Sequence, residues 1–174
     1  MKTIGKYLTG FVLFAVIASG LHAQDAWKEY SSKEDSMAYS MPADPTPDTQ
    51  TQDSAIGKIT IKSYILEQSN CALMVMVTVY TDQVLQQATP AKVLATVRDG
   101  AMGHINGKVV SEKQIAIDGN PGIAFDFDSA QYHGTYRIYL VGKRLYQLQS
   151  MAAVGTPVLA GTDRFMNSFR LLKP

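Results

Sequence analysis

Three side chains within one short stretch, Asp126, Asp128 and His133, are of the types that bind divalent metal ions. The two aspartates alternate with apolar residues, so a strand would point both carboxylates to the same side. His133 follows across a predicted loop. One interpretation is therefore a metal-binding or metal-dependent protein that uses these three residues. The other, which we favour, is a solvated strand face running into a polar loop, because ligand types without a fixed spacing are a weak signal.

The sequence contains none of the spaced motifs that mark common catalytic and cofactor sites. It lacks a G-x-S-x-G nucleophile elbow, a G-x-G-x-x-G after a strand, C-x-x-C and H-E-x-x-H. The histidines beyond the N-terminal segment are His104 and His133. Cys71, the single cysteine, begins an apolar segment, where we expect a buried and unreactive thiol. The sequence thus predicts no cofactor and favours a non-enzymatic function over an enzyme.

Aromatic residues offer a second kind of candidate site. Tyrosine and tryptophan combine an apolar body with a polar group, and both are common at binding surfaces. We consider a binding surface that includes Trp27, Tyr132, Tyr139 and Tyr146. Packing within the core and along a sheet explains most of these aromatic residues equally well, so both interpretations stay open.

The N-terminal segment has the pattern of a secretory signal peptide. Lys2 and Lys6 precede an apolar run at 8–18 that is too short to cross a bilayer comfortably, and small residues follow. Cleavage is expected after Ala23 or, alternatively, after Gly20. No later stretch reaches the roughly 18 consecutive apolar residues of a spanning helix. We therefore expect residues 1–23 to be removed on export and residues 24–174 to form one periplasmic or secreted domain without a transmembrane segment.

The charge balance gives no reason to expect a polyanionic partner. The chain has 16 Lys and Arg, of which Lys2 and Lys6 precede the predicted cleavage point, leaving 14 against 15 Asp and Glu. Nucleic acids and anionic membrane surfaces attract proteins with an excess of basic residues. We expect no nucleic-acid binding.

Alternating apolar residues predict several strands. The clearest pair is a hairpin in 135–151, where Gly142 and Lys143 form a two-residue turn that places Tyr139 opposite Tyr146. Other strands are predicted at 37–41, 58–68, 71–80, 108–118 and 123–128, and the segment 42–55 reads as an extended connection with a strand beginning near Thr49. The strand at 71–80 is apolar on both faces, which predicts that it is covered on both faces.

Two helices are predicted from their start signals. Thr89 can cap a helix that has Pro90 in its first position, and a stripe of apolar residues continues to a stop at Asn106. Thr156 and Pro157 repeat this start and predict a second helix that ends near Ser168. Strands followed by a helix, antiparallel strands and a terminal helix indicate an α+β domain.

The pattern resembles exported proteins with the PsbP-like fold. The resemblance spans nearly all of residues 24–174 and is carried by an early "WKEYSS" and "MAYSMPADP", the turn "GNPG" before "IAFDF", the hairpin "RIYLVGKRLYQL" and a late "FMNSFRL". It implies an antiparallel β-sheet packed between α-helices as an α/β/α sandwich. It also implies a non-catalytic binding or assembly role. We therefore expect an exported binding module for a protein partner or a small apolar ligand in the cell envelope.

Overall fold

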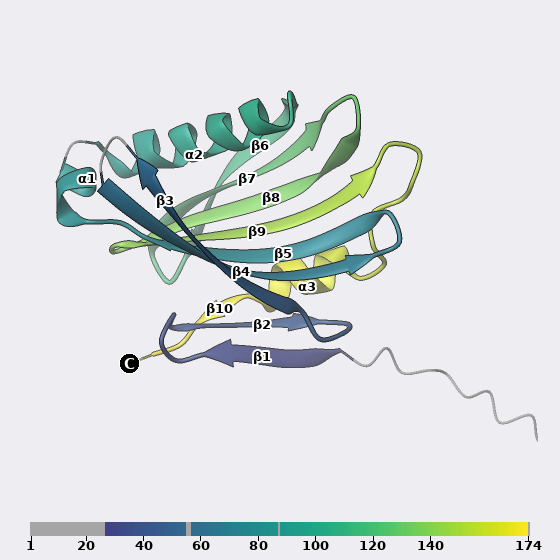
Figure 1. The fold of residues 1–174 in the computed structure, drawn as a ribbon, viewed down its shortest axis with the longest axis horizontal. Coiled ribbons are helices and arrows are strands. Elements are labelled where there is room, and N and C mark those ends of the chain that lie inside the picture. The colour runs from purple at the N-terminus through teal and green to yellow at the C-terminus, as the bar shows by residue number, and fades with distance from the viewer. Residues whose placement is uncertain (1–26, 55–56, 87, 174) are drawn as a thin grey trace, which may run out of the picture.

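A computed structural model describes residues 27–54, 57–86 and 88–173 (Figure 1). The predicted signal peptide and both predicted cleavage points lie outside these residues. Within them, no helix has the length and apolar character needed to cross a membrane.

A strongly twisted antiparallel sheet of seven strands forms the centre of the described part of the chain (Figure 1). Its order is β3-β4-β5-β9-β8-β7-β6, so the pairing of β5 with β9 joins the earlier strands to the later ones. The strands are β3 (Thr46–Ser54), β4 (Gly57–Gln68), β5 (Cys71–Val79), β6 (Lys108–Ile117), β7 (Asn120–Asp128), β8 (Tyr132–Val141) and β9 (Arg144–Ala153).

Local turn chemistry sets the hairpins of this sheet. Gly142 has a φ of 55° in the turn between β8 and β9, and Tyr139 pairs with Tyr146 as predicted. The turn before β7 lies slightly earlier than predicted. Asp118 and Gly119 take positive φ values of 46° and 78°, and Asn120 already belongs to the strand. Asp-Gly suits a tight turn with two positive φ angles, which explains this position.

The helix α2 (Pro90–His104) packs on one face of the sheet (Figure 1). Its start is the predicted one: the Thr89 hydroxyl accepts a hydrogen bond from the Lys92 N–H at 3.3 Å, and Pro90 follows the cap. Val93 and Leu94 pack against strand residues of β7 and β8 such as Phe125.

A small second sheet and a short helix cover the opposite face (Figure 1). The second sheet consists of β1 (Lys28–Ser32), β2 (Met37–Met41) and β10 (Arg170–Leu171), and the helix is α3 (Thr162–Ser168). Met37, Met41 and Phe165 pack with Val75 and Leu148 of the central sheet. The expected sheet between helical layers is thus present only in part, because three strands share the second layer with α3.

The second predicted helix begins later than its Thr-Pro signal indicated. Thr156 donates its N–H to Ala153 O, and Thr156 O and Pro157 O bond to the side chains of His133 and Cys71. These contacts hold the segment outside a helix. The helix starts only after Gly161, whose φ of 85° suits glycine. The structure also contains a short helix that was not predicted, α1 (Asp82–Gln86).

The segment predicted mainly as a connection at 42–55 contributes a full edge strand. β3 pairs with β4 along its whole length, from Thr46 opposite Ile65 to Ser54 opposite Gly57. Polar residues and prolines obscured this strand in the sequence. An edge strand tolerates both, because one of its edges has no hydrogen-bonding neighbour.

Candidate functional site

An apolar groove of about 680 Å³ lies between α2 and the sheet. It exists because α2 packs over β7 and β8, while β5, β4 and β3 extend beyond it on the same face. The prediction that the strand at 71–80 is covered on both faces is therefore wrong for one face. Leu73, Val75 and Val77 are buried against the second layer, whereas Met74 and Met76 are partly exposed and line the groove.

Strand register places two rows of side chains on the floor of the groove, since directly opposed residues of antiparallel strands point to the same face. The first row, called the Tyr136 row, runs through Tyr136, Gln149, Met74 and Ile65. The second, called the Asp48 row, begins at Ile138, which is fully buried and does not itself line the groove, and continues through Gln147, Met76, Ser63 and Asp48. Both rows start beneath α2 and lead outward toward the edge of the sheet at β3.

The methionines divide sharply between core and groove. Among those in the described residues, Met37, Met41, Met102 and Met166 are buried. The three that are partly exposed, Met74, Met76 and Met151, all line the groove. Methionine is flexible and polarisable, and it is over-used where one surface accepts ligands of different shapes. This distribution therefore indicates an adaptable apolar binding surface.

One face of α2 forms the wall of the groove. The residues that form it follow helical spacing and are Val97, Gly100, Ala101, His104 and the capping residue Ile105. A Cβ atom added at Gly100 would meet no heavy atom within 4 Å. Glycine inside a helix is less favourable than alanine by about 1 kcal/mol, and no contact in the described structure requires it here. Gly100 leaves space for an occupant to approach the helix backbone.

The polar groups on the floor are mostly uncharged. Ser63 and Gln149 have exposed fractions of 8% and 6%. The Gln149 Nε2 group donates to the Met151 sulfur at 3.5 Å. Burial raises the pKa of the Tyr136 hydroxyl to about 12, with a smaller opposing effect of its hydrogen bond to Gln149, so this hydroxyl stays neutral at physiological pH.

A carboxylate stands at the outer rim of the groove. Asp48 is exposed on the edge strand β3 and accepts a hydrogen bond from Gln50 Nε2 at 2.8 Å. His104 is exposed on the opposite wall, at the end of α2. The groove thus combines an apolar middle, amide and hydroxyl groups along the floor, and one carboxylate at its edge.

The predicted metal ligands lie elsewhere, on the face opposite α2. The Asp126 carboxylate accepts a hydrogen bond from the Ser111 hydroxyl at 2.7 Å. Asp128 is directly opposite His133, whose Nε2 contacts Thr156 O at 2.8 Å. In the described parts of the chain, no three His, Cys, Asp or Glu side chains come close enough to hold a metal ion. Metal binding stays a prediction that would require these side chains to rearrange.

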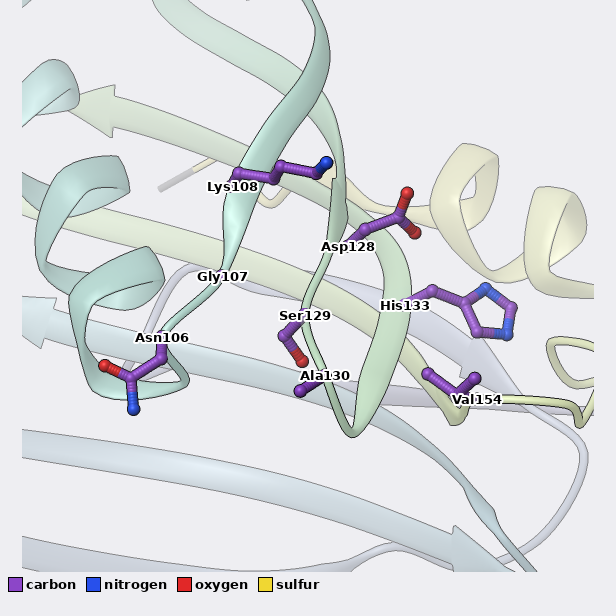
Figure 2. Close-up of a pocket in the computed structure, with 8 residues that line it drawn as sticks. All are labelled: Asn106, Gly107, Lys108, Asp128, Ser129, Ala130, His133 and Val154. Atoms are coloured by element: carbon purple, nitrogen blue, oxygen red, sulfur yellow. The ribbon is translucent and has the colours of Figure 1, made fainter.

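A second cavity, of about 560 Å³, lies beside Asp128 and His133 (Figure 2). Figure 2 shows Lys108, Asp128 and His133 projecting to the same side from neighbouring strands. Strand register places Lys108 directly opposite Asp128. A lysine next to a lone carboxylate repels a metal cation, so this cavity gives the metal interpretation little support.

The four aromatic candidates do not form one surface. Tyr139 and Tyr146 are 6% and 1% exposed and pack on Phe169 in the second core layer. Trp27 lies against Gly161 at the start of α3, with the Arg164 guanidinium 4.7 Å from its ring centre. Tyr132 is the one that lines the groove. Inward-facing strand positions explain why Tyr139 and Tyr146 serve the core.

Cys71 differs from the expected buried thiol. It is partly exposed at the start of β5, and its Sγ donates to Pro157 O at 3.2 Å. This contact helps to hold the segment between β9 and α3.

Comparison with solved structures gives the fold. The solution structure of cyanobacterial PsbP (CyanoP) from Synechocystis sp. PCC 6803 superposes with a TM-score of 0.54, covering 90% of this chain and 98% of that one. The chain has a PsbP-like fold. Sequence identity to CyanoP is 14%, so the similarity between the two proteins concerns the fold alone. No family model matches the chain, and neither does any curated protein.

Sequence reasoning missed the residues that shape the groove. It assigned Met74 and Met76 to a covered strand face and did not consider Met151 or Asp48. For Gly100 the sequence predicts only a weaker helix, by about 1 kcal/mol relative to alanine. A usable signal was present, since a glycine inside a helix carries this cost and the cost needs a reason.

Proposed function

We propose that this protein is an exported, non-catalytic binding protein whose groove holds a small apolar or amphiphilic ligand. The observation that carries the proposal is the convergence of the three partly exposed methionines on one groove. Ligand sites in proteins are concave and mostly apolar, with a few polar groups that fix orientation. The groove has this composition. Export rests on the N-terminal pattern at 1–23 and belongs to the same proposal.

The groove offers little support for hydrolysis. Ser63, His104 and Asp48 all line it, and these are the residue types of a catalytic triad. A triad requires the histidine to hydrogen-bond both the nucleophile and the carboxylate. Among the described residues, no such bond joins them, and Asp48 instead bonds to Gln50. Ser63 belongs to the floor, while His104 belongs to the helix wall.

The proposal predicts saturable binding of n-dodecyl maltoside, used below its micelle-forming concentration as an uncharged amphiphilic probe. A ligand that binds the folded state at 100 times its Kd stabilises that state by about 2.7 kcal/mol. For a domain of this size, the midpoint of thermal unfolding should rise by roughly 5–10 °C. Calorimetric titration should give one site per chain. Absence of both a saturable thermal shift and a heat of binding would contradict the proposed function.

A further inference from the structure

We propose that the groove selects amphiphiles by head group, accepting a single alkyl chain with a cationic or uncharged head and disfavouring an anionic one. This inference rests on the proposed function and adds the chemical class of the ligand. It depends on the direction of the two floor rows, on the space at Gly100 and on the charges around the rim.

The shape of the groove suits one unbranched chain. Gly100 and Ala101 give the middle of the helix wall its smallest side chains, and the Tyr136 row beneath contributes Met74 and Ile65. An alkyl chain lying along this row would contact thioether and aliphatic groups on the floor and the helix backbone at Gly100. Each methylene removed from water contributes favourably to binding. Ligand affinity should therefore grow with chain length until the groove is filled.

The positions of the buried and the exposed groups along the two rows set the orientation of the ligand's alkyl chain. Toward the centre of the sheet, the rows end beneath α2 at Tyr136 and Ile138, both of which are buried. Toward the edge, the Asp48 row ends at an exposed carboxylate on β3. A head group that retains its water is therefore placed at the β3 rim, beside Asp48, with the chain directed inward.

The charges at this rim disfavour an anion. Among the described residues that line the groove, Asp48 is the acid and none is a lysine or arginine. On β4, Lys62 lies opposite Thr49, one position away from the Asp48 pairing, and therefore points to the other face. There its ammonium group pairs with Glu34 at 2.7 Å and Asp35 at 3.1 Å. A carboxylate head would thus meet a like charge, whereas a quaternary ammonium head would meet an opposite one.

The test compares three probes with the same chain: dodecyltrimethylammonium, n-dodecyl maltoside and dodecanoate, each below its micelle-forming concentration. An exposed ion pair of this kind changes affinity about two- to fivefold. We expect the ammonium probe to bind at least as tightly as the maltoside and dodecanoate to bind more weakly than both. The difference between ammonium and dodecanoate should shrink as salt is added.

Asp48→Asn should remove this selectivity, so that the ammonium probe and dodecanoate bind with similar affinity. Asp126→Asn is the matched control, because it removes the same charge from a strand face outside the groove and should preserve the order of the three probes. Dodecanoate binding as tightly as the ammonium probe, or an unchanged order in Asp48→Asn, would overturn the head-group inference while leaving the proposed function standing. If none of the three probes binds, the proposed function itself fails and the inference falls with it.

Discussion

Replacing Gly100 by phenylalanine is expected to weaken n-dodecyl maltoside binding at least tenfold without destabilising the protein. The wall of the groove is open at this position, since an added Cβ meets no heavy atom within 4 Å. A phenyl ring there would take up space in the groove that Met74 and Met76 also line. Because phenylalanine is a better helix former than glycine by about 0.5 kcal/mol, the unfolding midpoint should stay the same or rise slightly. Calorimetric titration and thermal unfolding measure the two effects separately.

Gly103→Phe supplies the matched control for this substitution. Gly103 lies on the same helix and is equally free of neighbours within 4 Å, but it does not line the groove. The control should gain the same helix stability and keep the affinity for the maltoside. Equal losses of affinity in the two variants would mean that the ligand does not lie against Gly100.

Gly134→Ala should have the largest effect on stability, a loss of more than about 3 kcal/mol in the free energy of unfolding. Gly134 lies in β8, where it pairs with Met151 of β9. A Cβ at this position would lie 2.0 Å from Ser150 O and 3.0 Å from the Met151 Cα. Both atoms are backbone, so two central strands must move apart. Chemical denaturation, read by circular dichroism, measures the change.

Gly100→Ala is the contrasting substitution and should raise the free energy of unfolding. The same methyl group at that position meets no heavy atom and should stabilise the helix by about 1 kcal/mol. Opposite signs for the two Gly→Ala substitutions would support the described packing. A loss below about 1 kcal/mol for Gly134→Ala would show that β8 and β9 are less closely packed than described here.

Features set by neighbouring residues were predictable from the sequence. The turn at Gly142 and the cap at Thr89 each depend on a few adjacent residues, and both form as predicted. The start of α3 and the strand β3 depend on distant contacts. The Thr156 carbonyl bonds to His133, and β3 gains its structure by pairing with β4. Such contacts override a local Thr-Pro signal or a polar composition.

The candidate groove was not predictable, because it depends on where α2 lies across the sheet. Alternation correctly indicated that Met74 and Met76 share a strand face. It could not show that α2 covers β7 and β8 and stops short of β5. The aspartates drew attention because their types suit metal binding. A metal site also requires the fold to bring its ligands together. In this fold the Asp126 carboxylate accepts a hydrogen bond from Ser111.

The central claim, that the groove is the binding site, is tested most directly by methionine methyl NMR. The protein is labelled with 13C in its methionine methyl groups and titrated with n-dodecyl maltoside. We predict that the resonances of Met74, Met76 and Met151 shift with a common saturation curve. The buried Met37, Met41 and Met166 of the second layer should change little, and they act as internal controls. A titration that leaves the three groove methionines unchanged, or shifts the core methionines equally, would contradict the account.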